Sequence, residues 1–325
     1  MGLILNSPIQ HHYVPQVYLS FFESSEKPGS VYFYRRGAGP RLVSTRKVAK
    51  ERHLYSFTDK AGKLNTFVET ALSKLESDVK PILVRLNAAK ESISLSTDET
   101  SLLFTFISVQ AARTPAFRKV IKQMSVNLAQ MTLQQAVQNI DWLRDRLAEQ
   151  NQSDITAEEL QEFILDDSKY TIETDGDYYL LEQLRLQMEI HKAISIKNPV
   201  LLKSEESPFI TSDFPVTLVK DPRAPSYYGA GFLTSTIYLP LGQHTCLLLV
   251  NPPVPECSDP SEMWVGLSKI PPSKVRWINK LMVHSAEKYL FASNYNQKIQ
   301  KIFDATTNPE RVEFSSPFTR ARKNQ

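Results

Sequence analysis

Residues 199–220, PVLLKSEESPFITSDFPVTLVK, and residues 235–250, STIYLPLGQHTCLLLV, decide the fold class of this 325-residue chain. Both stretches are rich in Val, Ile, Leu, Tyr and Thr, and Pro and Gly separate their apolar runs, as is typical of short strands joined by turns. We expect strands at 200–202, 209–211, 216–219, 237–239 and 246–250, with a turn at 241–244 between the last two. A β-rich part therefore covers about residues 198–295.

The first 60 residues add extended structure at the other end of the chain. Residues 31–34 predict a strand, residues 37–40 a turn, and residues 41–44 the hairpin partner of that strand. Near the other end, residues 272–288 predict a helix and residues 289–291 a short strand. We assign residues 1–60 to the same β-rich part as residues 198–295.

A helical middle, about residues 65–197, separates these two parts. Apolar residues recur at helical spacing over 67–86, and capping boxes begin at Ser96 and Thr156. We expect helices over 67–86, from Ser96 to Arg113, over 117–149, after Thr156, and over 177–196. The expected fold is α+β: a helical central lobe packed with a small mixed or antiparallel β-sheet from the N- and C-terminal segments, all in one domain, 1–325. A split near residue 198 is the alternative.

The composition excludes several classes of protein. Hydrophobic residues make up 42% and charged residues 22% of the chain, as in an ordinary globular protein, and only 10 Gly argue against glycine-rich phosphate loops. Two cysteines, Cys246 and Cys257, are too few for a disulfide framework. No apolar run approaches the roughly 18 residues that span a bilayer. We expect a soluble, cytoplasmic protein without a membrane partner, and the oligomeric state stays open.

The net charge of +3 hides a marked asymmetry. Residues 141–189 hold 14 acids and 4 bases, a net charge of −10, so the rest of the chain carries +13. One acid, Glu51, and seven bases lie within residues 35–52, the bases being Arg35, Arg36, Arg41, Arg46, Lys47, Lys50 and Arg52. Such a cluster binds phosphates or a nucleic-acid backbone, or it forms a solvated face, or it pairs with the acidic stretch.

Residues 11–22, HHYVPQVYLSFF, form the most distinctive segment. Pro15 suits the first turn of a helix, and Tyr18, Leu19 and Phe22 would share its buried face. His11 and His12 precede it in extended chain, where adjacent side chains point to opposite sides, so at most one of them faces a given site. Imidazole serves as acid, base or metal ligand near neutral pH. The alternative is a histidine bonded to a backbone carbonyl near the helix start.

This segment resembles the opening of the bacterial domain-of-unknown-function family 4238, which begins His-His-Tyr-Val-Pro. The likeness continues through residues 31–34 and 54–56, the helix of Glu69 and Glu76, the sequence QAARTP at 110–115, and residues 209–216 and 239–241. It covers roughly residues 9–295. The family has no assigned activity, so the resemblance implies a family and no mechanism.

Four polar residues of the helical middle are candidates for chemistry. Glu69 and Glu76 are seven residues apart, so they lie on nearly the same helix face, where paired carboxylates bind a divalent cation or act as acid and base. Solvated or arginine-paired carboxylates are the alternative. Gln110 and Arg113 are neighbours on an apolar helix, and a buried arginine requires an acid partner, Glu69 or Glu76. That pair is either structural or the floor of an anion site.

Asp213 is a candidate from the β-rich part. It follows a strand-like run and precedes a Phe-Pro pair, and polar residues at such positions often carry function. It is equally suited to a turn, where an aspartate bonds its own backbone. The sequence leaves both interpretations open.

Two functions fit these candidates. The first is a metal-dependent phosphodiesterase or nuclease. In that enzyme His11 or His12 would be the general base or a metal ligand, and Glu69, Glu76 and Asp213 would bind Mg²⁺ or Mn²⁺. Arg113 would neutralise charge in the transition state. The residues that bind the nucleic-acid backbone would be Gln16, Gln110, Arg35, Arg36, Arg46, Lys47 and Arg52. The second is a non-catalytic binding or regulatory module, in which the motif residues form a structural polar network. Open exposure of both histidines and Asp213 would favour the enzyme, and burial would favour the module.

Overall fold

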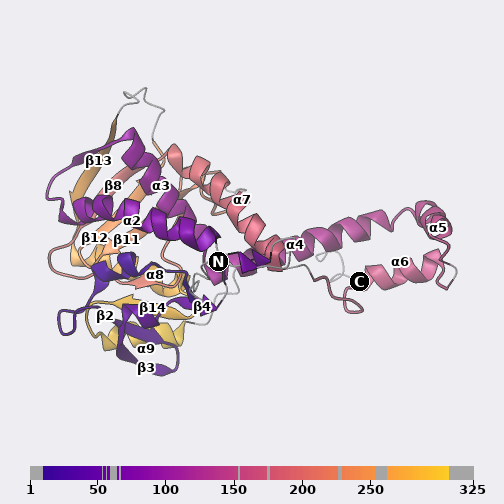
Figure 1. Cartoon of the computed structure of the whole chain (residues 1–325), viewed down its shortest axis with the longest axis horizontal. Helices are drawn as coiled ribbons and strands as arrows, with labels where there is room; N and C mark the ends of the chain where they lie inside the picture. The colour runs from indigo at the N-terminus through magenta and orange to yellow at the C-terminus, as the bar shows by residue number, and fades with distance from the viewer. Residues whose placement is uncertain are drawn as a thin grey trace, which may run out of the picture. The chain divides into compact units, whose positions relative to one another are not determined.

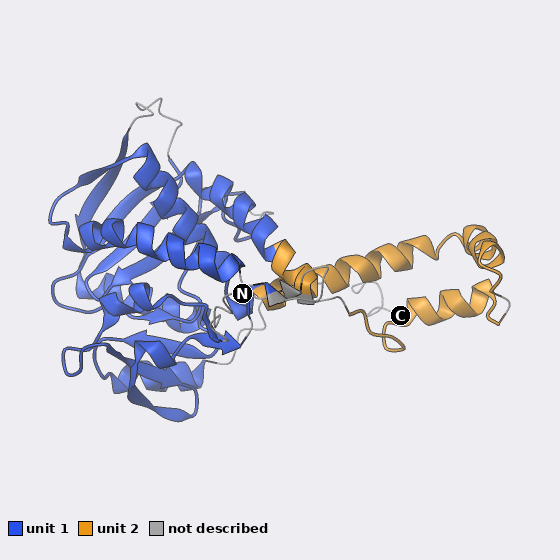
Figure 2. Cartoon of the chain, in the orientation of Figure 1, with its two compact units in different colours: residues 1–117, 183–309 blue, residues 118–182, 310–325 orange. Residues whose placement is uncertain are grey.

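The computed structural model describes residues 10–306 apart from 53, 56, 59–63, 66, 153, 174–175, 226–228 and 253–261. Its contacts divide the chain into two compact units (Figure 2). Unit 1 comprises residues 1–117 and 183–309, and unit 2 comprises residues 118–182 and 310–325. The expected helical lobe, 65–197, is divided between the two units, because residues 65–117 and 183–197 belong to unit 1. The prediction of a single domain stays a prediction.

The largest sheet of unit 1 is six-stranded and mixed (Figure 1). Its strands, in spatial order, are β10 (Thr217–Lys220), β11 (Ser235–Gly242), β12 (Thr245–Val250), β8 (Asn198–Lys203), β13 (Glu262–Lys269) and β7 (Ile93–Ser96). Only the β8–β13 pair is parallel. Gln243 and His244 form the tight turn between β11 and β12, as predicted.

A second, antiparallel sheet joins the two ends of the chain. Its order is β3 (Ala38–Ser44), β2 (Ser30–Arg35), β14 (Tyr289–Ala292) and β9 (Thr211–Ser212). The β2–β3 pair is the predicted hairpin, and β14 lies between it and β9. Two short ribbons complete the described strands: β1 (Gln10–His12) with β4 (Lys50–Arg52), and β5 (Phe57–Thr58) with β6 (Leu64–Asn65).

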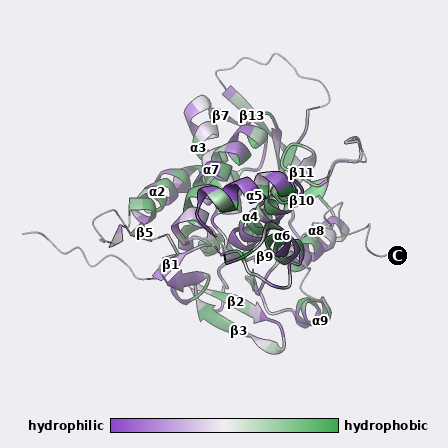
Figure 3. Cartoon of the chain, turned by 90° about the vertical axis from the view of Figure 1, so that its right-hand side faces the viewer, coloured by the Kyte–Doolittle hydropathy of each residue, from purple (hydrophilic) through white to green (hydrophobic). Residues whose placement is uncertain are grey.

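The helices of unit 1 follow the local signals in the sequence. Ser96 and Glu99 form a reciprocal capping box at the start of α3, and Arg113 is its C-cap. In Figure 3 the ribbon of α2 alternates between hydrophilic and hydrophobic segments, as expected for an amphipathic helix. The bounds are α1 (Gln16–Leu19), η1 (Ser20–Phe22), η2 (Thr45–Lys47), α2 (Phe67–Ala88), α3 (Thr97–Ala112), α8 (Pro272–Ser285) and α9 (Gln297–Ala305).

Helix α8 joins the cores of the two large sheets. Its first half, with Val275 and Ile278, packs with residues of β8, β11 and β12. Its second half, with Met282 and Val283, packs with residues of β2, β14 and α9. Leu281 contacts both clusters. Burial of these apolar side chains, each contributing about 1.5–3 kcal/mol, holds the sheets against one another.

Unit 2 contains most of α4 (Pro115–Ala136), α5 (Ile140–Glu149), α6 (Ala157–Leu165) and the first residues of α7 (Gly176–Ser195). The single helix expected over 117–149 is wrong, because it breaks after Ala136. Asn139 caps a new helix by accepting a hydrogen bond from the Trp142 N–H at 3.0 Å. A small core around Val137, Leu143 and Ala157 holds the helices of this unit together.

The predicted α+β class is confirmed, and the sheet content was underestimated. The N- and C-terminal segments build the four-stranded sheet, whereas the six-stranded sheet also recruits β7 from the helical middle. The strand expected at 209–211 is shorter and begins at Thr211. No helix in the described part of the chain has the length and apolar character needed to span a bilayer. Cys246 is buried as a free thiol, and Cys257 lies outside the described residues.

Candidate functional site

The ribbon of β1 and β4 separates the two histidines, as predicted. The strands are antiparallel with Gln10 opposite Arg52, His11 opposite Glu51, and His12 opposite Lys50. Side chains directly opposite one another share a face, and alternate residues of a strand share a face. The side chains of Gln10, His12, Lys50 and Arg52 therefore lie on one face of the ribbon. We call these four residues, together with the adjoining Gln16, the β1–β4 face.

His11 lies on the other side of the ribbon and is fully buried. Its Nδ1 accepts a hydrogen bond from the Tyr55 N–H at 3.0 Å. The imidazole also stacks on the Tyr55 ring, with centroids 5.6 Å apart and planes within 2° of parallel. These contacts anchor β1 to the segment after β4, so the geometry assigns His11 a structural position.

Arg113 is the centre of a second buried group. Its Nε donates to the Tyr13 carbonyl at 3.0 Å, Nη1 donates to Glu76 Oε1 at 2.9 Å, and Nη2 donates to Gln110 Oε1 at 3.1 Å. Gln110 donates in turn to the same Tyr13 carbonyl at 3.1 Å. Tyr55 connects this group to His11, because its hydroxyl donates to the Arg113 carbonyl at 3.0 Å. The predicted acid partner of Arg113 is confirmed as Glu76.

The burial of this group decides its chemistry. Arg113 is 5% exposed and Gln110 1% exposed, so neither presents a donor to a surface ligand. The predictions that Gln110 binds the ligand and that Arg113 neutralises transition-state charge are therefore replaced: both residues have structural roles. Glu69 is half-buried, and burial, with a smaller contribution from Glu76, raises the pKa of its carboxyl, while Arg113 lowers it. The two glutamates thus lie close enough to interact, as their helical spacing predicted.

Asp213 is buried and fastens a turn far away in the sequence. Its Oδ1 accepts from the Glu287 N–H at 2.8 Å, and its Oδ2 accepts from the N–H groups of Lys288 and Tyr289 at 2.7 and 3.1 Å. The Asp213 N–H also donates to the Tyr289 carbonyl at 3.0 Å. Neither sequence interpretation anticipated this, because the carboxylate holds the backbone between α8 and β14 and not its own turn.

The residues expected to bind Mg²⁺ or Mn²⁺ do not fit such a site. Within the described residues, no group of three or more His, Cys, Asp or Glu side chains has the arrangement of a metal site. Asp213 uses both carboxylate oxygens on backbone N–H groups, and Glu76 is paired with Arg113. Carboxylates engaged in this way are poor ligands for a hard cation, which takes six or more oxygens.

His12 is half-buried on the β1–β4 face, with its Nδ1 enclosed by the protein. Its Nε2 lies 3.0 Å from Gln16 Nε2, so the neutral ring accepts from the Gln16 amide. Burial, then the charges of Lys50 and Arg113, lower the pKa of His12 to about 4, and the backbone of Val48 acts in the opposite direction. His12 is therefore uncharged at neutral pH, beside a lysine on the same face.

The basic cluster divides into one structural cation and six exposed ones. Arg36 donates to the carbonyls of Ala286, Glu287 and Thr306, and its guanidinium lies 4.1 Å from the centre of the Phe303 ring. Its predicted role in binding is therefore replaced by one in fixing the ends of α8 and α9. The remaining side chains are exposed, and none forms an ion pair with another described residue: Arg35, Arg41, Arg46, Lys47, Lys50 and Arg52.

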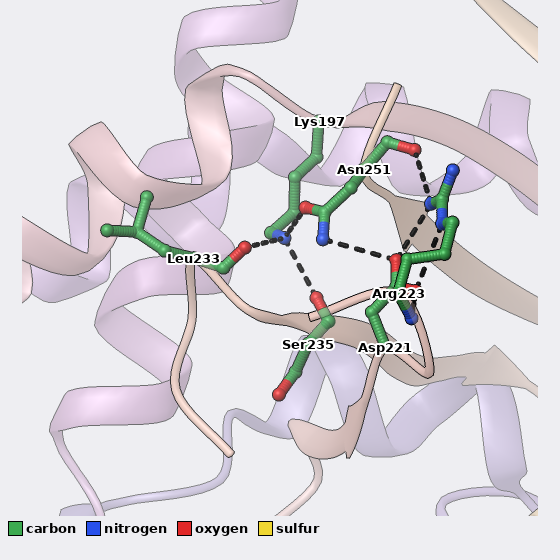
Figure 4. A network of polar contacts seen from close by, with 6 residues as sticks. All are labelled: Lys197, Asp221, Arg223, Leu233, Ser235 and Asn251. Atoms are coloured by element: carbon green, nitrogen blue, oxygen red, sulfur yellow. Dashed lines mark hydrogen bonds and ion pairs between the residues drawn. The ribbon is translucent and has the colours of Figure 1, made fainter. Parts of the chain in front are cut away.

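Lys197 was not among the residues predicted to be functional, and it is fully buried, with 0% exposure. Its Nζ donates to the Ser235 carbonyl at 2.8 Å, to the Leu233 carbonyl at 3.4 Å, and to Asn251 Oδ1. Figure 4 shows how Asn251 continues to Asp221, which Arg223 binds through two nitrogens at 3.1 and 2.7 Å. Burial lowers the pKa of Lys197 to about 8, and Asp221 opposes that shift.

This network is structural, since the Lys197 ammonium group donates to three oxygens of the protein. It ties the α7–β8 turn to the start of β11 and the end of β12. Hydropathy predicts the reverse of what is observed, because the apolar Ile196 is 58% exposed while the charged Lys197 is buried. A lysine of this kind is found only once the backbone carbonyls around it are located.

Comparison with known proteins supports the resemblance noted in the sequence. No match was found among curated proteins or among solved structures. A model of the family described as "Protein of unknown function (DUF4238)" matches residues 10–296, which includes β1, the Arg113 group, Asp213 and β14. Because that match covers most of the chain, the protein belongs to the DUF4238 family.

Proposed function

We propose that this protein binds the phosphate backbone of nucleic acid, as a non-catalytic module, through the β1–β4 face and the exposed bases beside it. The observation that carries the proposal is the set of six exposed cations within residues 35–52, unpaired among the described residues. Cations that are not neutralised within the protein are available to replace the counterions of a polyanion, which supplies most non-specific binding energy.

The geometry of the ribbon supports a linear ligand. Lys50 and Arg52 are two residues apart on one strand, which places them about 7 Å apart along one face. That interval is of the order of the separation of successive phosphates in an extended single strand. Arg46 and Lys47, in and at the end of η2, precede them by a few residues, so the cations follow one another along the chain.

Uncharged hydrogen-bonding groups accompany these cations. Gln10 and Gln16 present amides at the surface, and His12 is neutral at pH 7. Neutral donors and acceptors beside cations are suited to sugar and base contacts, which position a nucleic acid without adding charge. The metal-dependent nuclease stays a prediction without support from the described contacts, because two of its three expected carboxylate ligands, Glu76 and Asp213, are engaged elsewhere.

The test is fluorescence anisotropy with a labelled single-stranded oligonucleotide and its duplex, between about 50 and 200 mM salt. We expect binding that weakens steeply with salt. For the single strand, replacing both Lys50 and Arg52 by Ala should reduce the slope of log K against log salt by about 1.4, since each phosphate contact contributes about 0.7.

The matched control carries the same charge change elsewhere in unit 1. Lys80 and Lys90 are also exposed, and the double variant Lys80→Ala/Lys90→Ala should retain the slope of the unmodified protein. The proposal fails if the protein binds neither probe, or if the two double variants lose affinity equally. Circular dichroism of each variant confirms that the fold is retained.

A further inference from the structure

Helix α4 carries an apolar stripe with the spacing of a coiled-coil seam. Phe117, Ile121, Met124, Leu128 and Met131 alternate at intervals of four and three residues, the pattern of heptad positions that face a partner helix. Ile121 is buried, but the seam beyond it is open, with Met124 45%, Leu128 67% and Met131 38% exposed. We call these last three residues the α4 seam.

The covered side of this part of α4 lies opposite the seam. A pocket of about 440 Å³ is bounded on one side by residues of α4 and on the other by the chain at 170–173, its lining being Lys119, Lys122, Gln123, Val126, Gln130, Tyr170, Thr171, Ile172 and Glu173. At 100° per residue, positions 119, 126 and 130 point roughly opposite to position 128. The segment that faces α4 there therefore leaves the seam open.

Methionine and leucine are suited to contact with another helix. Leu128 would be the central knob, and the flexible thioethers of Met124 and Met131 adapt to an opposing surface. Single apolar side chains are common on protein surfaces, whereas three large ones in a row on one helix face are typical of an interaction site. An apolar surface of a partner is needed to cover these three side chains.

The distribution of charge along unit 2 indicates which partner fits the α4 seam. Helix α4 holds three bases near its start, Arg118, Lys119 and Lys122, and no acid between residues 115 and 136. The two helices that follow, α5 and α6, hold six acids and two bases, Arg144 and Arg146, a net charge of −4. Asp141, at the start of α5, is 84% exposed and forms an ion pair with Arg144 of the same helix at 2.8 Å. One end of α4 is therefore basic, and the other is followed by two helices whose combined charge is negative.

A second copy of the chain, paired antiparallel, complements both the seam and the charges. A two-fold axis at Leu128 places residue 118 of one copy opposite residue 138 of the other, beside the acidic start of α5. Parallel pairing would bring the basic ends of both copies together, which is unfavourable. The antiparallel contact is isologous, so it closes as a dimer and does not propagate.

We propose that the α4 seam is a homodimer interface, in which two copies of α4 pack antiparallel around Leu128. The interface is small, with three large apolar side chains from each copy, and it belongs with the weaker interfaces, below about 1,200 Å². The dimer is therefore concentration-dependent. This inference is independent of nucleic-acid binding, which uses residues of unit 1.

Sedimentation equilibrium of the full chain tests the interface. We expect a monomer–dimer equilibrium that Leu128→Glu shifts to monomer, with at least a tenfold rise in the dissociation constant. Leu133, also 38% exposed, lies on the pocket side of α4, so Leu133→Glu is a control with the same charge change and should still dimerise. A protein that is monomeric at all concentrations, or a dimer weakened equally by both variants, overturns the proposal.

Cysteine cross-linking tests the orientation, in a Cys257→Ser background since Cys246 is buried. Leu128→Cys should form a disulfide-linked dimer, because residue 128 meets its own counterpart at the axis. In the antiparallel pair, residue 124 faces residue 132, so two Cys at position 124 lie about 12 Å apart along the axis, beyond the reach of a disulfide. Efficient cross-linking through Met124→Cys would overturn the antiparallel arrangement.

Discussion

Replacing Arg113 by Ala tests whether the motif residues stabilise the fold. The guanidinium makes three hydrogen bonds in a 5% exposed position, one of them an ion pair with Glu76. Breaking a buried pair by removing one partner costs about 3–5 kcal/mol. The Glu76 side chain is 24% exposed and regains some hydration, and the Tyr13 carbonyl keeps its bond from Gln110. We therefore expect a loss of about 3–4 kcal/mol, toward the lower end of that range.

Urea unfolding followed by far-ultraviolet circular dichroism measures this loss. With a slope of about 3 kcal/mol per molar urea, the midpoint should fall by about 1 M. Arg85→Ala is the control, because Arg85 forms an exposed ion pair with Glu99 and should cost about 1 kcal/mol or less. Equal shifts for the two variants would refute the reasoning and return Arg113 to the candidates for ligand contact.

Three further predictions follow from the buried polar groups. Asp213→Asn should lower the free energy of unfolding by about 3 kcal/mol in urea, because the amide cannot accept the three backbone hydrogen bonds; unchanged stability would contradict the structural role. The pKa of His12 is lower in the folded than in the unfolded protein, so neutral His12 contributes its full share of stability above about pH 6.5 and loses it as the pH falls toward about 4. His12→Gln should flatten this pH dependence of stability, and an NMR titration that gives the His12 imidazole a pKa near 6.5 would disprove the prediction. Lys197→Met should lower the thermal midpoint and cost about 2–4 kcal/mol, since it leaves buried carbonyl oxygens without a donor; a neutral effect in calorimetry would show that the ammonium group is dispensable.

Local signals predicted the elements that local interactions form. The capping boxes at Ser96 and Thr156 mark helix starts in the structure, because the bonds that define them lie within four residues. The hairpin of β2 and β3 followed from a turn between two extended runs. The break before α5 was missed although Asn139 is a good N-cap residue, whose side chain accepts from the Trp142 N–H.

Contacts between distant segments were predictable only where energetics demanded them. An arginine on an apolar helix needs an acid, which limited the partner to Glu69 or Glu76, and the structure places Glu76 there. No comparable demand points from Asp213 to the backbone of residues 287–289, because many donors would satisfy a carboxylate equally well. Strand β13 was also missed, since it has little apolar alternation and Val265 is its only described residue in the buried core.

The opening motif therefore combines two roles on two sides of one short strand. His11 faces inward and, through Tyr55, joins the group around Arg113, which also contacts Tyr13 and Glu76. His12 faces the solvent side with Gln16 and Lys50, and nothing in the buried group requires an imidazole there. Its Nε2 accepts from the Gln16 amide and its Nδ1 is buried, so His12 orients Gln16 beside the exposed cations and adds no charge of its own. If the motif has a function beyond folding, His12 and not His11 is the residue that carries it.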